Sequence, residues 1–150
     1  MKRLLAATLF LLASCTNTSP ANHASHSVEL RNKPFTVEFA ADEASREQGL
    51  MMRATLAADH GMLFVFPATA PQAFWMKNTL IPLDILYFDT DRQLVSMRLD
   101  VPPCKTDPCP IYPGDKPARY VLELSAGTAQ RIGAQIGDEL KIDGDTGTAR

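Results

Sequence analysis

The chain has 150 residues, 45% of them hydrophobic and 21% charged, with a formal net charge of −2 at pH 7. These values are ordinary for a single soluble globular domain, and they argue against a second hydrophobic core. The acidic balance also argues against nucleic acid as a partner.

The N-terminus resembles the signal sequence of bacterial lipoproteins. Residues 1–3 form a short basic start, residues 4–12 are mostly apolar, and small residues lead to Cys15. The apolar run is too short to cross about 30 Å of hydrocarbon as a mature helix, and segments of this form are normally removed. We therefore expect residues 1–14 to be a cleaved signal peptide and Cys15 to carry the lipid. In the alternative, the signal is an ordinary cleaved one and Cys15 is incidental.

The residue after this cysteine suggests where the mature protein lies. In the lipoproteins that the N-terminus resembles, Asp at this position favours retention in the inner membrane, and here the residue is Thr16. We expect an outer-membrane lipoprotein on the periplasmic side of the bacterial cell envelope, with the membrane as a partner through Cys15. Loss of Lys2 and Arg3 with the signal leaves 13 basic against 17 acidic residues, a net charge of −4.

The segment from Thr16 to Ser27 is built of small polar residues and has no apolar periodicity. It is typical of a flexible tether, so residues 15–27 are expected to join the lipid to a single domain over residues 28–150. His23 and His26 lie in this tether. Two histidines on a flexible linker supply neither a fixed geometry nor a full ligand set, so we expect no metal site there.

The first part of the domain predicts a strand and a short helix. Apolar and polar residues alternate over residues 35–39, as in a strand with one wet face. Asp42 is placed to cap a helix over residues 43–48. Gly49 is placed to end that helix in the left-handed conformation and to return residues 50–51 to the core.

Two unbroken apolar runs follow. Residues 62–66 are typical of a central strand covered on both faces, and Pro67 is expected to stop it. Residues 81–88 form a second run of this kind. The turn residues 89–93 lead into another strand over residues 94–101, so the pair is expected to form a hairpin.

The last part of the domain repeats the pattern of strand and helix. Residues 120–124 alternate as a strand, Ser125 is placed to cap a helix that reaches Ile132, and Gly133 is placed to end it. A closing strand is expected over residues 140–142. Many short strands, with two short helices that do not alternate regularly with them, predict a mainly β fold, a compact antiparallel sandwich or barrel.

Several motifs, taken in their order along the chain, resemble those of the DUF192 family of domains of unknown function. They are Arg46, Gly49-Leu50-Met51, Arg53, GMLFVF (61–66), FWMKNTLIPLDILYFD (74–89), Cys109-Pro110, YVLEL (120–124), Ala126-Gly127 and Ile136-Gly137-Asp138. The resemblance covers about residues 28–143, essentially the whole mature domain. It implies a compact, mostly β fold of the jelly-roll type in bacterial or archaeal proteins that are often exported. It implies no established reaction.

Polar residues interrupt the apolar stretch over residues 74–89. Asp84 lies in a strand that has no obviously polar face, so we expect its side chain to be at least partly buried. A buried carboxylate left unpaired costs several kcal/mol and should find a cation or backbone donors. Within the family motifs, the candidate cations are Lys77, Arg53 and Arg46.

Two interpretations of this cluster stay open. In the first, Asn78 and Asp84 form a polar clasp that fixes the entry of the strand. In the second, Asp84 is a general acid or base, with Lys77 and Asn78 contacting a substrate beside the aromatic surface of Trp75. Full burial of Asp84 with saturated hydrogen bonds would favour the clasp, and a concave pocket above it and Trp75 would favour the site. The candidate binding residues are Arg53, Trp75, Lys77, Asn78 and Asp84.

Two classes of function follow from these features. The tether, the acidic surface and the lack of a recognisable catalytic motif favour a lipid-anchored binding or accessory module with a small-molecule or envelope-protein ligand. The polar cluster alone favours a small envelope hydrolase or lyase that acts through Asp84, Lys77 and Asn78. The sequence has no nucleophile elbow, phosphate-binding glycine loop or zinc-protease helix, and we predict no cofactor and no metal site.

Cys104 and Cys109 remain as an even pair once Cys15 is taken by lipid. An oxidising periplasm favours a disulfide between them, and the prolines around them stiffen the loop. A zinc site lacks two further ligands, and a redox pair usually has two intervening residues at a helix start. We predict a structural disulfide.

Overall fold

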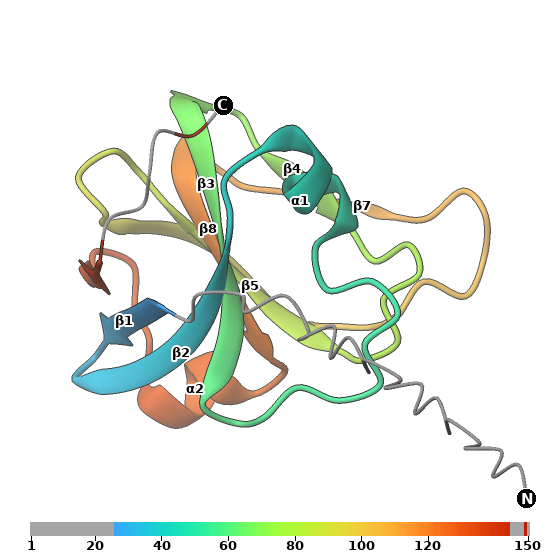
Figure 1. Ribbon diagram of the computed structural model, residues 1–150, viewed down its shortest axis with the longest axis horizontal. Helices are drawn as coiled ribbons and strands as arrows, with labels where there is room; N and C mark the ends of the chain where they lie inside the picture. Colours follow the sequence, from blue (N-terminus) through green and yellow to red (C-terminus); the bar gives the residue numbers. More distant parts are fainter. Residues whose placement is uncertain (1–25, 145–148, 150) are drawn as a thin grey trace, which may run out of the picture.

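The computed structural model describes residues 26–144 and 149. These residues form a curled seven-stranded sheet, a separate two-stranded ribbon and two short helices (Figure 1). The expected signal peptide, Cys15, His23 and most of the tether lie outside the described residues. No helix within the described part of the chain is long and apolar enough to cross a membrane.

The strands have the order β6-β5-β8-β3-β2-β1-β9 in the large sheet, and β4 pairs with β7 in the ribbon. Their bounds are β1 (His26–Leu30), β2 (Lys33–Ala40), β3 (His60–Ala70), β4 (Ala73–Trp75), β5 (Leu83–Phe88), β6 (Leu94–Val101), β7 (Ile111–Pro113), β8 (Ala118–Ser125) and β9 (Leu140–Asp143). The helices are α1 (Glu43–Gln48) and α2 (Thr128–Ile132). The expected mainly β fold is confirmed. The sheet is mixed, because the long connection through α1 makes β2 and β3 parallel while the other neighbours are antiparallel.

The sheet curls until its two edge strands meet at one end. Gln93, just before β6, forms an antiparallel bridge with Glu139, just before β9. The amide of Leu94 also donates a hydrogen bond of 2.8 Å to the carbonyl of Asp138. This contact closes part of the edge that an open sheet would expose, so the architecture is a half-barrel.

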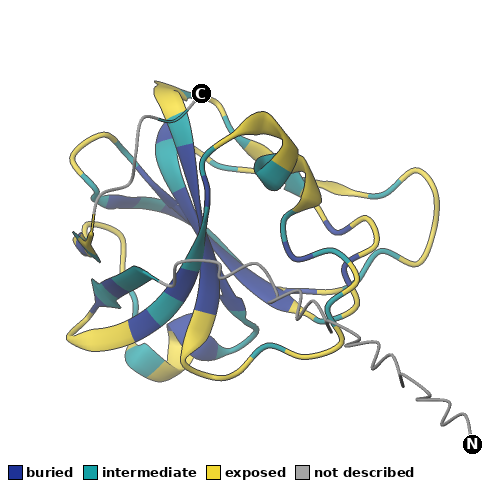
Figure 2. Ribbon diagram, viewed as in Figure 1, coloured by how far each residue is buried: buried dark blue, intermediate teal, exposed yellow. Residues whose placement is uncertain are grey.

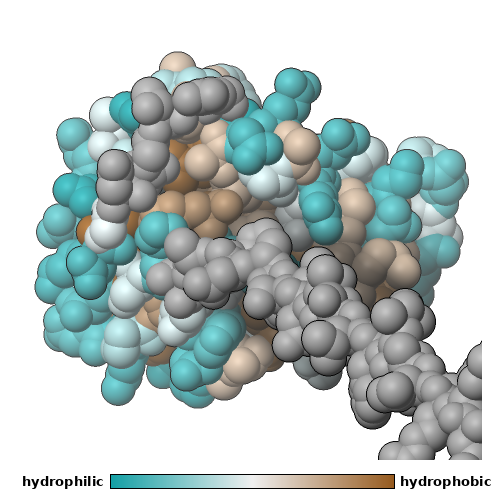
Figure 3. Space-filling model, viewed as in Figure 1, coloured by the Kyte–Doolittle hydropathy of each residue, from teal (hydrophilic) through white to brown (hydrophobic). Residues whose placement is uncertain are grey.

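The middle strands β5, β8 and β3 are covered on both faces, and this divides the core into two clusters. The cluster inside the curl includes Leu63, Leu86, Phe88, Leu122 and Leu124. The cluster on the outer face lies against the ribbon and includes Phe64, Ile85, Tyr87 and Val121, with Phe74 and Tyr112 packed on it. Buried segments lie in the middle strands of the sheet, whereas α1 and the loops are mainly exposed (Figure 2). On the face shown in Figure 3, hydrophilic side chains form most of the outline and apolar atoms show between them nearer the centre.

The local signals of the first helix are confirmed with one correction. Asp42 caps α1 and forms a capping box with Ser45. Gly49 ends the helix at φ 47° and ψ −136°, a positive φ but not the left-handed helical conformation that we expected. Leu50 then returns to the core, while Met51 remains partly exposed.

Two predicted boundaries are wrong. Strand β3 does not stop at Pro67 but continues to Ala70. Proline has no N–H to pair, and the register between β3 and β8 breaks between Val65 and Ala70, so the strand passes Pro67 where the ladder is interrupted. At the start of the domain, His26 and Ser27 belong to β1 instead of the tether, and the His26 ring stacks on that of Phe39 with centroids 3.9 Å apart.

The predicted cap of the second helix is also wrong. Ser125 is the last residue of β8, and its hydroxyl donates to the carbonyl of Leu56 at 3.2 Å. The N-cap of α2 is Gly127, which has no side chain to accept a hydrogen bond. The free amides at the start of α2 are instead bound by a carboxylate from β5, that of Asp84.

Asp84 is a buried structural clasp, with 0% of its side chain exposed. Its Oδ1 accepts hydrogen bonds from the amides of Asp100 at 3.0 Å and Gly127 at 3.2 Å, and its Oδ2 accepts one from Ala129 at 2.8 Å. The expected cation does not approach it, because backbone N–H groups supply the compensation that we assigned to Lys77, Arg53 or Arg46. Asp84 therefore ties β5 to β6 and to the start of α2.

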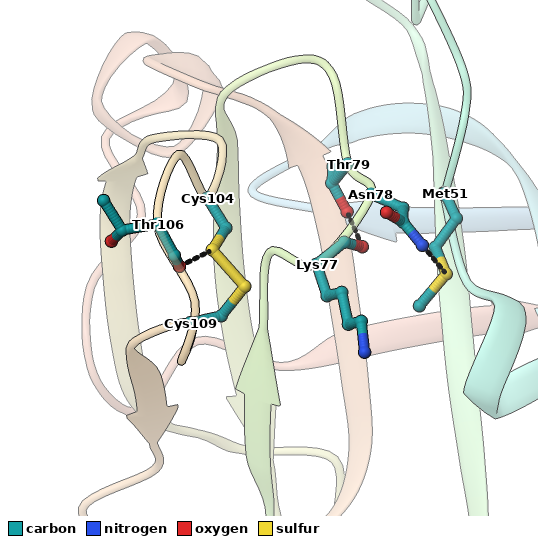
Figure 4. The surroundings of a disulfide bond; sticks show 7 residues. All are labelled: Met51, Lys77, Asn78, Thr79, Cys104, Thr106 and Cys109. Atoms are coloured by element: carbon teal, nitrogen blue, oxygen red, sulfur yellow. Dashed lines mark hydrogen bonds between the residues drawn. A yellow bond between two sulfur atoms is a disulfide. The ribbon is translucent and has the colours of Figure 1, made fainter.

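The predicted disulfide is present between Cys104 and Cys109, whose Cα atoms lie 5.6 Å apart. The amide of Cys104 donates to the carbonyl of Met76 at 3.3 Å. Figure 4 shows that this loop lies beside the turn of residues 77–79 that follows β4. The disulfide loop thus supports one side of the region that holds Trp75, Lys77 and Asn78.

We expect Asp84→Asn to lower the free energy of unfolding by about 3 kcal/mol in urea titrations at neutral pH, because the amide group cannot accept from both sides and leaves a buried donor unpaired. Asp91→Asn removes the same charge at an exposed turn and is the matched control, with an expected change below about 0.5 kcal/mol. Equal stability of Asp84→Asn and the wild type would show that the clasp is not needed.

Candidate functional site

The structure brings three of the predicted binding residues together and separates the other two. Trp75, Lys77 and Asn78 lie at the end of β4 and in the turn after it, where they line one shallow hollow. Arg53 is elsewhere, in a two-fold ion pair with Glu38 in which Nη2 and Oε2 are 2.6 Å apart. Asp84 is enclosed on the inner face of β5. A shared pocket around Asp84, Lys77 and Asn78 is therefore absent from the described part of the chain.

Asn78 has a structural part in this turn. Its backbone takes φ 55°, a conformation that asparagine tolerates better than most residues. Its carbonyl accepts from the amide of Met52 at 2.8 Å, and its side-chain amide points to the sulfur of Met51 at 3.9 Å (Figure 4). These contacts join the turn after β4 to the segment after α1.

Trp75 and Lys77 form an exposed pair beside this turn. The Nζ atom of Lys77 lies 5.1 Å from the centre of the Trp75 ring, and Trp75 is 45% exposed. A cation at this distance over an indole face is attracted by the electrons of the ring. The face of Trp75 is thus in contact with a cation of the chain itself.

A pocket of about 410 Å³ opens between α1 and β4 and reaches down to the outer face of the large sheet. Its walls are aromatic and come from β3 and β4: Phe64, Phe66, Phe74 and Trp75. Phe64 and Phe74 meet edge to face, with ring centroids 4.8 Å apart. The volume lies within the range of small-molecule sites, roughly 300 to 1,000 Å³, and the aromatic lining is typical of them.

Charged side chains of both signs stand around this pocket. Helix α1 contributes Glu43, Arg46 and Glu47, and Lys77 comes from the turn after β4. Arg46, which we considered as a partner of Asp84, instead donates to the carbonyl of Val65 at 3.0 Å and lies over the ring of Phe66 at 5.4 Å.

Glu123 forms the floor of the pocket and was not identified from the sequence. It lies on β8, opposite Met62 of β3 and Ile85 of β5, so its neighbours across the sheet are apolar. Only 4% of the residue is exposed, and no described residue forms a hydrogen bond or ion pair with its carboxyl group. Since these oxygens are not among the fully enclosed polar atoms without a partner, they keep some accessible area at the pocket.

Burial raises the pKa of Glu123 from its ordinary value of 4.5 to about 8. The carboxyl group is therefore largely protonated at neutral pH and can donate or accept a hydrogen bond. None of the described residues that line the pocket is a serine, cysteine or histidine. The site thus offers a buried acid and aromatic walls, but no side chain of the kinds that usually act as a nucleophile with a histidine base.

The sequence did contain a signal for Glu123. Alternation over residues 120–124 places Glu123 on the same face as Val121, and Val121 is fully buried. A single carboxylate in an apolar strand is the feature that drew attention to Asp84. The sequence of β8, however, does not indicate whether the face that carries Val121 and Glu123 is covered.

We expect the buried acid to make the protein less stable as the pH rises. The unfolded carboxyl loses its proton near pH 4.5, whereas the folded one keeps it up to about pH 8. Between these values the folded state holds one more proton, so its stability falls by up to about 1.4 kcal/mol per pH unit. Urea titrations of the wild type and Glu123→Gln from pH 4 to 9 measure this directly. The difference in the free energy of unfolding between the two proteins should change between about pH 4.5 and pH 8 and be constant outside this range. A difference that stays constant over the whole pH range would contradict the raised pKa.

Comparisons with known proteins agree with the fold and the motifs. A crystal structure of a candidate transcription regulator from Sinorhizobium meliloti 1021 is 40% identical, with a TM-score of 0.76 over 83% of this chain and 98% of that chain. A protein of unknown function from Novosphingobium aromaticivorans is 29% identical, with a TM-score of 0.73 over 86% of this chain and 94% of that chain. No curated protein sequence matches the chain. The family model DUF192, described as an uncharacterized ACR, matches residues 25–142, and the chain belongs to this family.

Proposed function

We propose that the protein is a binding module of the bacterial cell envelope, anchored by lipid at Cys15, that holds a small molecule in the pocket between α1 and β4. One observation carries this proposal: the aromatic pocket ends at a buried carboxyl group that has no partner among the described residues. A buried polar group without a partner lowers stability. A ligand that binds the group would supply the missing interaction.

The two buried carboxyl groups of the core differ in a way that supports this proposal. Asp84 accepts three backbone hydrogen bonds and serves the fold. Glu123 has none from the described residues and faces a hollow. A group that only had to stabilise the fold would be expected to resemble Asp84, since unpaired buried acids are costly.

The geometry favours binding over the alternative of a hydrolase or lyase that acts through Asp84. A general acid or base must come within hydrogen-bond reach of its substrate. Asp84 is fully buried, and its two oxygens already accept three hydrogen bonds. A role in transcription, as in the name of the Sinorhizobium protein, is a further alternative. The net charge of −4 expected for the mature protein argues against a nucleic-acid partner here.

A ligand in the pocket should change the emission of Trp75, the only tryptophan of the chain. We expect a screen of envelope metabolites to yield compounds that raise the melting temperature and also shift this emission, because both effects follow from occupation of the same site. Ala73→Leu adds bulk to the pocket and should lower the affinity for these compounds by tenfold or more, as measured by both effects. Ala57→Leu changes an exposed alanine outside the pocket and should leave the affinity unchanged. Compounds that bind Ala73→Leu as tightly as the wild type would place the site elsewhere.

The anchor is tested by labelling cells with a fatty-acid analogue. The wild-type protein should take up the label and fractionate with the outer membrane, because acylation at Cys15 would hold it there. Cys15→Ser should lose the label, and Cys104→Ser is the control that should keep it. A labelled Cys15→Ser protein in the membrane fraction would rule out this anchor.

A further inference from the structure

The charge around the pocket between α1 and β4 indicates which class of ligand it takes. The lining residues include three acids, Glu43, Glu47 and Glu123, and two cations, Arg46 and Lys77. With Glu123 ionised, these five side chains therefore sum to −1. A ligand with one positive charge would neutralise the set, whereas an anion would add to the imbalance and lie close to a buried carboxylate.

The aromatic walls of the pocket also favour a positively charged ligand. Aromatic rings carry negative potential on their faces and attract cations within about 6 Å of their centres. Two rings of this pocket already do so, since Arg46 lies over Phe66 at 5.4 Å and Lys77 lies over Trp75 at 5.1 Å. The rings of Phe64 and Phe74 line the same pocket as Glu123, and Phe64 is buried.

A metal ion fits the site less well than an organic cation. Within residues 26–144 and 149, no group of three or more histidine, cysteine, aspartate or glutamate side chains is arranged to hold a metal. The residues paired with Glu123 across the sheet, Met62 and Ile85, are apolar, and one carboxylate does not satisfy the six to eight oxygen ligands of calcium or the octahedral shell of magnesium. An alkylammonium ion needs only one strong acceptor and apolar surface for its carbon atoms.

We propose that the pocket takes a small organic cation, a protonated primary amine whose ammonium group pairs with Glu123 and whose carbon skeleton packs on Phe64 and Phe74. This inference rests on the ligand-binding function proposed above and specifies its ligand class. Glu123 is almost wholly buried, so each ammonium N–H that reaches its carboxylate makes a charge-assisted hydrogen bond.

Binding of this ligand is coupled to release of one proton from Glu123. The empty pocket holds Glu123 mainly protonated at neutral pH, and an ammonium ion pairs with the ionised form. The other titratable groups that line the pocket are the α1 side chains Glu43, Arg46 and Glu47 and the side chain of Lys77, and Tyr87 on β5 interacts with Glu123. Burial raises the pKa of Tyr87 well above its ordinary value, so that phenol stays neutral. The β3 residues that face Glu123 are apolar.

Four compounds of similar size separate the possible ligand classes in a titration of Trp75 emission. They are cyclohexylammonium, cyclohexanol, cyclohexanecarboxylate and cyclohexyltrimethylammonium, added to the full chain in detergent micelles. We expect cyclohexylammonium to bind at least about tenfold more tightly than cyclohexanol at pH 8. Its affinity should rise about tenfold from pH 6 to pH 7 and level off above pH 8, since alkylammonium groups stay charged up to about pH 10.

Glu123→Gln keeps the shape of the side chain and removes its charge, so it should abolish both the preference for the amine and the rise with pH. Glu139→Gln removes an exposed carboxylate away from the pocket and should keep both. The pH series on the wild-type protein stands as a test even if Glu123→Gln does not fold.

Three results would overturn the inference: equal affinity for the amine and the alcohol, an amine affinity that is flat from pH 6 to pH 8, or equal binding of the quaternary ammonium by the wild type and Glu123→Gln. The last result would mean that the aromatic rings of the pocket, and not Glu123, select for cations. Binding of cyclohexanol without a preference for the amine would leave the proposed binding function intact. If no compound in the metabolite screen raised the melting temperature or shifted Trp75 emission, the binding function itself would fail.

Discussion

Coverage of the three middle strands on both faces is the constraint on which the rest of the structure depends. Every residue of β5 is buried, and β8 and β3 are buried over most of their paired length. The buried side chains of these strands have little access to bulk water, so each of their polar groups must find its partner within the fold or in a cavity. The inner face gives Asp84 three backbone donors, and the outer face gives Glu123 a pocket.

These two solutions have different consequences for the protein. The hydrogen bonds of Asp84 join β5, β6 and α2, and they replace the cap that Gly127 lacks. Glu123 contributes no such link among the described residues. Burial raises the pKa of Glu123, and we propose that its proton is exchanged for a bound cation. An unpaired buried carboxyl group lowers the stability of the fold, and such a loss is expected where a binding group is held in place before its ligand arrives.

Much of the fold could be predicted from the sequence where the signals are local. The turn over residues 89–93 predicted the β5–β6 hairpin, Asp42 located the start of α1, and spacing with proline predicted the disulfide of Cys104. The parallel pairing of β2 with β3 and the partners of Asp84 could not be predicted, because they join segments that are distant in the sequence. The alternation of residues 120–124 predicted which face of the strand carries Glu123, but it did not predict that the ribbon of β4 and β7 covers that face.

The protonation state of Glu123 is the most direct test of this account. The carboxyl carbon of a selectively labelled Glu123 can be followed by NMR as the pH is changed, first in the free protein and then with saturating cyclohexylammonium. The account predicts a pKa of about 8 in the free protein and a clearly lower pKa with the amine bound. A pKa near 4.5 in the free protein, or one that the amine does not move, would contradict a neutral buried acid that recognises a cation.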